Sequence, residues 1–233
     1  MPPFQFKKFS IQQNNTAMKV GTDGVLLGAW TTIKEGNVLD IGSGTGLIAI
    51  MIAQRSKTAI IDAVELETDA CQEAKVNSEN CNWSSRIAIH HTTIQDYYPP
   101  KKYDLIVSNP PFFINSTKAP NSERNSARHT DGLPFIDLIE AVLRLLKSDG
   151  LFSLILPLLE AERFIDLAKE QELFLNKKWL VKPTPTKPVK RVLMEFSLTI
   201  QPVFHKELII ETATRHQYTK DYISLTKDFY LKF

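Results

Sequence analysis

"VLDIGSGTGLIAI", at residues 38–50, joins an apolar strand to the apolar start of a helix through a glycine-rich turn. Gly42, Gly44 and Gly46 permit a positive φ and let a ligand approach the backbone, and the start of the following helix favours an anionic group. A nicotinamide site would need the spacing GxGxxG, but the third residue after Gly44 is Leu47. The turn therefore predicts a ligand site on an α/β fold, without the pyrophosphate of a dinucleotide.

Apolar runs alternate with longer amphipathic runs along the chain, as in βαβ units with parallel strands. We expect strands at 37–41, 59–64, 86–91, 103–108, 151–156, 174–181 and 192–200, and the clearest helices at 67–80 and 134–147. The chain has 233 residues and 43% apolar composition, enough for one sizeable core. We expect a single domain over 1–233, with an N-terminal extension at 1–30 that contributes to the site and a basic extension at 177–191.

Two acidic residues flank the glycine-rich turn. Asp40 lies two residues before Gly42, where a carboxylate would repel a pyrophosphate and suits an ammonium group. A ligand that has both an amine and a carboxylate fits this position. Glu65 follows 19 residues after Gly46, where a carboxylate can accept both hydroxyls of a ribose, although a solvated charge at a strand end is an open alternative.

An amino acid at the turn, a ribose at Glu65 and an adenine beyond it describe S-adenosylmethionine, and this pattern resembles class I methyltransferases. The resemblance implies a Rossmann-like fold, with a seven-stranded, mostly parallel sheet, an antiparallel last strand and helices on both faces. It also implies that Asp96, with Gln95 beside it, holds the adenine amine, whereas an Asp that caps a turn is the alternative. The expected cofactor-binding residues are Lys19, Thr22, Asp23, Asp40, Gly42, Ser43, Gly44, Gly46, Glu65, Gln95, Asp96 and Asn109.

The second informative stretch is "KKYDLIVSNPPFF", residues 101–113. Asn109 precedes a proline and is pushed to an extended conformation, and the two prolines remove two N–H donors. The side-chain oxygen of Asn109 and the carbonyl of Pro110 remain as acceptors, which can orient an exocyclic NH2 group toward a methyl group. Phe112 offers a face on which a base can stack. We expect Asn109, Pro110, Pro111 and Phe112 to carry the chemistry; a proline-rich turn without function is the alternative.

The motif NPPF resembles that of amino-directed methyltransferases, which modify adenine N6, guanine N2 or the glutamine side chain of release factors. "MKVGTDGVLLGAW" (18–30) is similar to the segment ahead of the glycine-rich turn in the bacterial family that N6-methylates adenine 37 of a valine tRNA. Lys19, Thr22 and Asp23 match that motif, although Thr22 or Asp23 is also a good helix N-cap. Residues 121–150 and 187–198 resemble the same family. The resemblance implies methyl transfer from S-adenosylmethionine to adenine N6 in tRNA.

Three alternatives to this reaction stay open. Two are enzymes: a guanine-N2 RNA methyltransferase and a protein glutamine methyltransferase. The third is an RNA-binding module that keeps the fold without the chemistry.

Charge is unevenly distributed along the chain. Residues 1–176 carry 17 basic and 21 acidic side chains, and residues 177–233 carry 11 and 5. A basic segment is typical of a polyanion partner, although a solvated surface has the same composition. We expect the tRNA to be contacted by residues in the loop after NPPF and in the basic extension, namely Arg124, Arg128, His129, Lys187, Lys190 and Arg191.

Cysteine use and hydropathy limit the other classes. Cys71 and Cys81 lack a CxxC spacing, so neither a disulfide framework nor a zinc site is expected, and free thiols are typical of the cytosol. The apolar stretch "LFSLILPLL" is too short to cross a bilayer and is interrupted by Ser153 and Pro157. We therefore expect a cytoplasmic protein that binds no membrane and no metal. The expected oligomeric state is a monomer, which no feature of the sequence determines.

Overall fold

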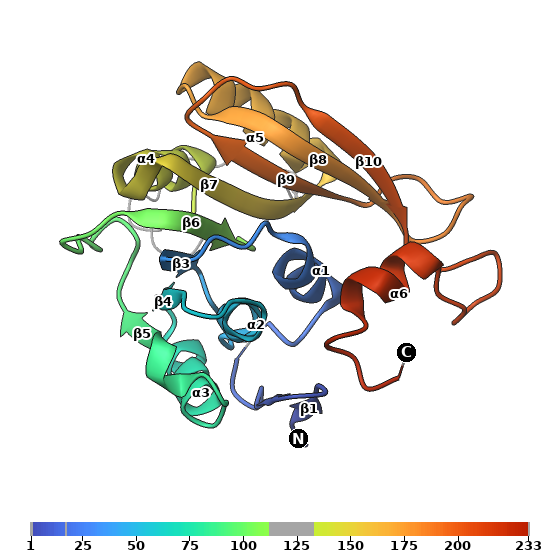
Figure 1. Cartoon of the computed structure of the whole chain (residues 1–233), viewed down its shortest axis with the longest axis horizontal. Coiled ribbons are helices and arrows are strands. Elements are labelled where there is room, and N and C mark those ends of the chain that lie inside the picture. Colours follow the sequence, from blue (N-terminus) through green and yellow to red (C-terminus); the bar gives the residue numbers. More distant parts are fainter. Residues whose placement is uncertain (1, 17, 112–132, 233) are drawn as a thin grey trace, which may run out of the picture.

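A computed structural model describes residues 2–16, 18–111 and 133–232, in which eight strands form one central sheet (Figure 1). Their order across the sheet is β10-β8-β9-β7-β6-β3-β4-β5. Neighbouring strands are parallel, except that β9 is antiparallel to both β7 and β8. The bounds are β3 Asn37–Ile41, β4 Ile60–Glu65, β5 Ile87–His91, β6 Tyr103–Ser108, β7 Leu146–Pro157, β8 Phe174–Lys182, β9 Arg191–Ser197 and β10 Phe204–Ile209.

The expectation of seven strands is corrected by β10, which lies beyond the predicted last strand and pairs in parallel with β8. The seven expected strands are present, and the one expected to be antiparallel is β9. β10 escaped prediction because its sequence FHKELI has no continuous apolar run, as befits an edge strand in which Leu208 alone is buried. β7 also begins earlier than expected, at Leu146, directly after α4.

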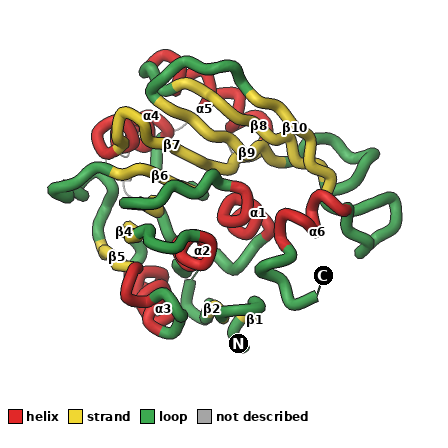
Figure 2. Tube along the Cα trace, in the orientation of Figure 1, coloured by secondary structure: helices red, strands yellow, loops and turns green. Residues whose placement is uncertain are grey.

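Helices cover both faces of the sheet, as Figure 2 shows. α4 (Phe135–Leu145) and α5 (Leu158–Glu170) bury apolar side chains against one face, where Phe152 and Phe196 form part of the core. α1 (Thr22–Trp30), α2 (Leu47–Arg55) and α6 (Lys220–Thr226) cover the other face. α3 (Thr68–Glu79) packs against β4 and β5, and a 3-10 turn, Ser84–Arg86, leads into β5. The helices expected at 67–80 and 134–147 are thus α3 and α4.

The N-terminal segment forms an outer layer over α1 and α2. β1 (Phe4–Gln5) and β2 (Ser10–Ile11) pair as a small antiparallel hairpin, and its aromatic side chains pack against Phe229 near the other end of the chain. The N–H of Lys7 donates to the carbonyl of Phe229 over 2.8 Å. None of the helices in the described ranges has both the length and the apolar character needed to cross a bilayer.

The strand order places the turns that follow β3, β4 and β6 at one edge of the sheet. β3 lies between β4 and β6. From β3 the strand order proceeds through β4 and β5 on one side and through β6 and β7 on the other, so the carboxyl end of β3 is a topological switch point. Ser108, the last residue of β6, donates its hydroxyl to the carbonyl of Ile41 over 2.9 Å. This bond ties the residue before Asn109 to the residue before the glycine-rich turn.

Candidate functional site

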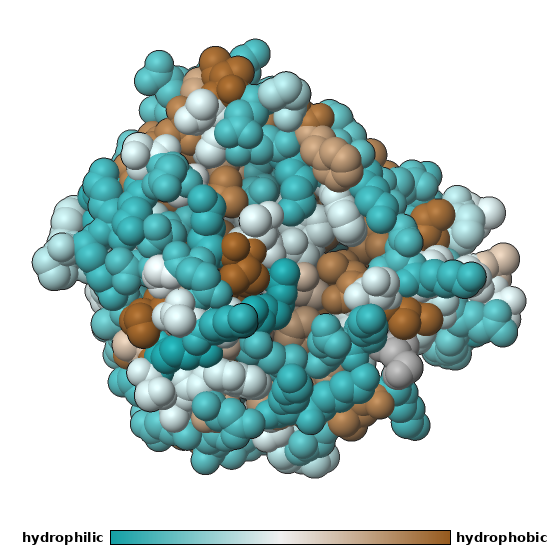
Figure 3. All heavy atoms as spheres, in the orientation of Figure 1, coloured by the Kyte–Doolittle hydropathy of each residue, from teal (hydrophilic) through white to brown (hydrophobic). Residues whose placement is uncertain are grey.

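A cavity of about 480 Å³ lies at this switch point. Its walls are residues 18–24, residues 42–45, the start of α2, Asn109, and a C-terminal group of Val181, Pro183, Lys190, Arg191 and Ile210. The volume falls in the range of small-molecule sites. In the space-filling view most of the surface is hydrophilic, and hydrophobic side chains gather near the middle, around the place where Figure 1 shows α1 (Figure 3).

The glycine-rich turn has the backbone that its sequence predicts. Gly42, Gly44 and Gly46 have φ values of +69°, +55° and +79°. A Cβ atom added at Gly42 or Gly44 would have no neighbour within 4 Å, so any side chain there would project into open space at the cavity wall. The N–H groups of Gly42 and Ser43 both donate to the carbonyl of Val64, which fixes the turn to the end of β4.

Two carboxylates lie behind the turn. Asp40 is fully buried, and its Oδ2 accepts the N–H of Ala49 over 3.1 Å. Burial raises the pKa of Asp40 to about 7, against the hydrogen bond from Ala49, and the charge of Glu65 raises it further. The Oδ1 of Asp40 and the hydroxyl of Ser43 are buried and have no hydrogen-bond partner among the described residues. These two oxygens can accept from a bound ligand.

Glu65, the last residue of β4, stabilises the glycine-rich turn by hydrogen bonding. Its Oε2 accepts the N–H of Gly44 over 2.7 Å, and its Oε1 accepts the N–H of Glu67 over 2.9 Å. The side chain is buried, so the alternative of a solvated charge at a strand end is wrong.

Asn109 lines the cavity directly after β6. Its side-chain nitrogen would lie 4.0 Å from a Cβ added at Gly24, so the amide faces the first turn of α1. Pro110 is buried and Pro111 is exposed. Phe112 lies outside the described residues, as do Arg124, Arg128 and His129.

The N-terminal residues of the predicted motif line the same cavity, and two of them already have partners. Lys19 Nζ donates to the carbonyls of Gln13, Asn14 and Thr16 over 2.5, 3.3 and 2.8 Å. Asp23 Oδ2 accepts from Arg191 Nε over 2.7 Å, which joins α1 to the start of β9.

Thr22 is the first residue of α1, and the N-cap is Gly21, which has no side chain to cap with. The alternative role of Thr22 or Asp23 as N-cap is therefore wrong.

Residues 15–128 match the family described as Methyltransferase small domain. The chain is 50% identical to the tRNA1(Val) (adenine(37)-N6)-methyltransferase of Flavobacterium psychrophilum, over 98% of this chain and 99% of the relative. It is 47% identical to the protein of the same name from Parabacteroides distasonis, over 99% and 98% of the two chains. The chain belongs to the tRNA1(Val) (adenine(37)-N6)-methyltransferase family.

Solved structures show that this family member has a class I methyltransferase fold. A predicted O-methyltransferase from Agrobacterium tumefaciens superposes with a TM-score of 0.72 at 18% identity, over 89% of this chain and 96% of the other. A putative RNA methyltransferase from Pyrococcus horikoshii superposes with a TM-score of 0.55 at 16% identity, over 76% and 82%. At these identities the likeness concerns the fold alone.

Five of the residues expected to bind cofactor in this methyltransferase do not line the described cavity: Asp40, Gly46, Glu65, Gln95 and Asp96. The last two lie in the loop after β5. Gln95 Nε2 donates to Asp137 of α4 over 3.0 Å. Asp96 accepts the hydroxyl of Thr93 over 2.7 Å, and its own N–H donates to that hydroxyl over 3.0 Å. The Thr93 hydroxyl, and not the Asp96 carboxylate, thus accepts the backbone N–H in this turn, and the Asp96 side chain is exposed.

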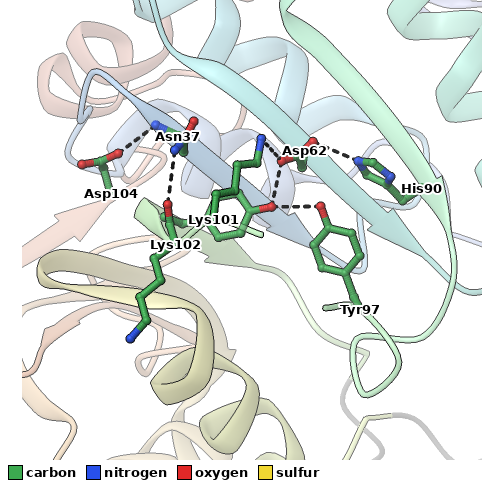
Figure 4. A network of polar contacts seen from close by, with 8 residues as sticks. Asn37, Asp62, His90, Tyr97, Lys101, Lys102 and Asp104 are labelled. Atoms are coloured by element: carbon green, nitrogen blue, oxygen red, sulfur yellow. Dashed lines mark hydrogen bonds and ion pairs between the residues drawn. The ribbon is translucent and has the colours of Figure 1, made fainter. Parts of the chain in front are cut away.

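A polar network around the buried Asp62 joins this loop to β4 (Figure 4). Asp62 of β4 accepts from Lys101 over 2.6 Å and from the hydroxyl of Tyr103 over 2.7 Å, and lies 2.9 Å from His90 Nε2. The hydroxyls of Tyr97 and Tyr103 are 2.9 Å apart. Burial would raise the pKa of Asp62, but the hydrogen bonds from these side chains hold it at about 2.

Lys187 and Lys190 are exposed in the connection between the antiparallel strands β8 and β9. Lys190 and Arg191 also line the cavity. Among the described residues, no group of three or more His, Cys, Asp or Glu side chains is arranged to hold a metal ion.

The sequence analysis did not single out Glu73 and Asn77 of α3, which accept hydrogen bonds from the backbone of residues 12–16. The signal in the sequence is their helical spacing with the small residues Ala70, Ala74 and Ser78, which places all five on the face that the structure shows to be buried.

Proposed function

We propose that the protein transfers a methyl group from S-adenosylmethionine to the N6 amine of adenine in tRNA, at adenine 37 of a valine tRNA. The observation that carries the proposal is one cavity lined both by the glycine-rich turn and by Asn109. The names of relatives that match this chain over nearly its full length support the same reaction.

The turn that lines the cavity and the two carboxylates behind it fit the cofactor. Open space beside Gly42 and Gly44 suits a ligand that lies against the backbone. The unpartnered Asp40 Oδ1 and Ser43 hydroxyl are acceptors for an ammonium group at that place. Glu65 uses one oxygen for each loop N–H, and each oxygen retains a lone pair for a ribose hydroxyl. S-adenosylmethionine, when bound, supplies an electrophilic methyl group on a sulfonium.

The chain's own part in the reaction is to hold the acceptor amine. Asn109 Oδ1 and the Pro110 carbonyl accept the two N–H groups of an exocyclic amine and orient its nitrogen. Positive charge grows on that nitrogen in the transition state, and these fixed oxygens stabilise it more than they stabilise the neutral base. No strong general base is needed, because the methylated amine loses its proton readily to water.

Two further groups have roles in this proposal. Asp96 would hold the adenine of the cofactor, with Gln95 beside it. Lys187, Lys190 and Arg191 would contact the RNA backbone, and the ion pair with Asp23 fixes the Arg191 side chain beside the cavity. An adenine stacked in a loop must be extruded to reach the site.

The test is to incubate the purified protein with methyl-labelled S-adenosylmethionine and total tRNA from cells that lack this protein. The tRNA is then digested to nucleosides. Label in N6-methyladenosine supports the proposal. Label in N2-methylguanosine or in protein glutamine would overturn it in favour of the corresponding alternative, and RNA binding without transfer would leave a binding module. A valine tRNA with guanine at position 37 should accept no label.

A further inference from the structure

Residues 12–16, which precede the cavity-lining residues 18–24, are hydrogen-bonded to two buried side chains of α3. Glu73 and Asn77 lie one turn apart on this helix and are only 7% and 2% exposed. Glu73 Oε1 accepts the N–H of Asn15 over 2.7 Å, and its Oε2 accepts the N–H of Thr16 over 3.1 Å. Asn77 Oδ1 accepts the N–H of Gln12 over 2.7 Å. We call residues 12–16 with these two side chains the clasp.

Asn77 also reaches the glycine-rich turn. Its Nδ2 donates to the carbonyl of Gln12 over 3.0 Å and to the carbonyl of Thr45 over 2.9 Å. One amide therefore bridges the N-terminal segment and the turn, and both its oxygen and its nitrogen are used.

Lys19 is hydrogen-bonded to the backbone of residues 13–16 from the C-terminal side of the clasp. Its ammonium donates to the carbonyls of Gln13, Asn14 and Thr16, all within the clasp. Lys19 and its neighbours Met18 and Val20 line the same cavity as Gly44 and Thr45. The position of one cavity wall relative to the other thus depends on bonds made by Glu73 and Asn77.

We propose that Glu73 and Asn77 are positioning residues for the cofactor: they hold residues 12–16 against the glycine-rich turn, and so set the two walls between which S-adenosylmethionine binds. The inference rests on the proposed function. A preformed site avoids the free-energy cost of ordering a loop on binding, so the clasp acts on cofactor affinity. In this arrangement Lys19 affects cofactor binding indirectly, because its ammonium holds the backbone of the clasp in one conformation.

Two substitutions change the hydrogen bonding with little change of shape. Glu73→Gln replaces one of two acceptor oxygens by a donor that faces a backbone N–H. Asn77→Asp replaces the shared donor by an oxygen that faces the carbonyls of Gln12 and Thr45. Glu79→Gln is the matched control, because Glu79 lies on the same helix and is exposed.

The first readout is the affinity for S-adenosylhomocysteine, measured by calorimetry. We expect Glu73→Gln and Asn77→Asp to raise Kd by about tenfold or more, while the control stays within about twofold of the wild type. In steady-state assays the KM for S-adenosylmethionine should rise, with kcat at saturating cofactor and the KM for tRNA nearly unchanged. A fall in kcat at saturating cofactor with no change in Kd would overturn the inference.

The second readout is hydrogen–deuterium exchange without ligand. In both variants the amides of residues 12, 15 and 16 should exchange faster, while those of β6 and β7 keep the wild-type rate. Faster exchange throughout the chain would mean a loss of stability and not of positioning, and would contradict the inference. If the wild type does not bind S-adenosylhomocysteine, the proposed function itself fails; if wild type and variants bind it equally, only the clasp fails.

Discussion

Asn109 stands at the end of a buried strand with its amide at the cavity and two prolines behind it. We expect Asn109→Ala to lower kcat by about 100-fold or more, because loss of one preorganised hydrogen-bonding group at a developing charge has an effect of that order. Cofactor affinity should stay within a few-fold, since the Asp40, Glu65 and glycine-turn contacts remain. Transfer kinetics and S-adenosylhomocysteine calorimetry on the same preparation check this. A loss of cofactor binding as large as the loss of kcat would contradict the division of roles.

Asp40 offers a test that needs no substrate. Burial raises the pKa of Asp40 to about 7 in the folded protein. The part of the unfolding free energy that depends on Asp40 is therefore highest at low pH, where Asp40 is protonated, and it falls as pH rises through the folded pKa. Asn in its place keeps an acceptor for the N–H of Ala49 and does not ionise. Between pH 4 and pH 8 the unfolding free energy of Asp40→Asn should gain roughly 1 to 4 kcal/mol relative to wild type.

Urea unfolding at the two pH values, without ligand, gives that difference. The exposed Asp166→Asn on α5 serves as control and should show no such gain. A difference between Asp40→Asn and wild type that does not change with pH would show that Asp40 titrates normally.

Among the elements, the loop 92–102 depends on contacts with β4 and β6. Tyr103 is fully buried, and its hydroxyl lies between Asp62 and Tyr97. Tyr103→Phe removes one donor from a buried carboxylate and one partner from a buried hydroxyl, so we expect a stability loss of roughly 1 to 3 kcal/mol. Equilibrium unfolding should show this loss, and the exposed Tyr98→Phe in the same loop should show none. Equal stability of the two variants would mean that water replaces the lost contacts.

Strands and turns were predictable where the signal is local. β6 has the predicted bounds because YDLIVS is an apolar run between lysines and an Asn-Pro step, and the glycine-rich turn and Asn109 follow from residues next to one another. β10 was not predictable, because only one of its side chains is buried at the sheet edge and its sequence has no apolar run. The pair of Asp23 and Arg191 joins residues 168 positions apart, and the contacts of Asn77 depend on which segments pack together. Such contacts exist only once the sheet order is set.

Across the whole molecule, the basic C-terminal part meets the cavity at the β8–β9 connection, where Lys190 lines the wall and Lys187 is exposed nearby. If these lysines contact RNA phosphates, tRNA affinity must fall with salt, because each neutralised phosphate releases condensed counterions. We expect Lys187→Ala and Lys190→Ala each to weaken tRNA binding and to reduce the slope of log K against log salt by about one unit.

The matched control for these lysines is Lys102→Ala, because Lys102 is also exposed but directly precedes β6, at the opposite end of that strand from Asn109. Filter-binding titrations of tRNA at several salt concentrations give the slopes, and S-adenosylhomocysteine affinity should be unchanged in the Lys187→Ala and Lys102→Ala variants, whose lysines do not line the cavity. If Lys102→Ala reduces the slope as much as the other two, RNA contacts charge over the whole surface. If only Lys187→Ala and Lys190→Ala do so, the RNA backbone lies along the β8–β9 connection, which would bring the extruded base to the side of the cavity formed by Arg191.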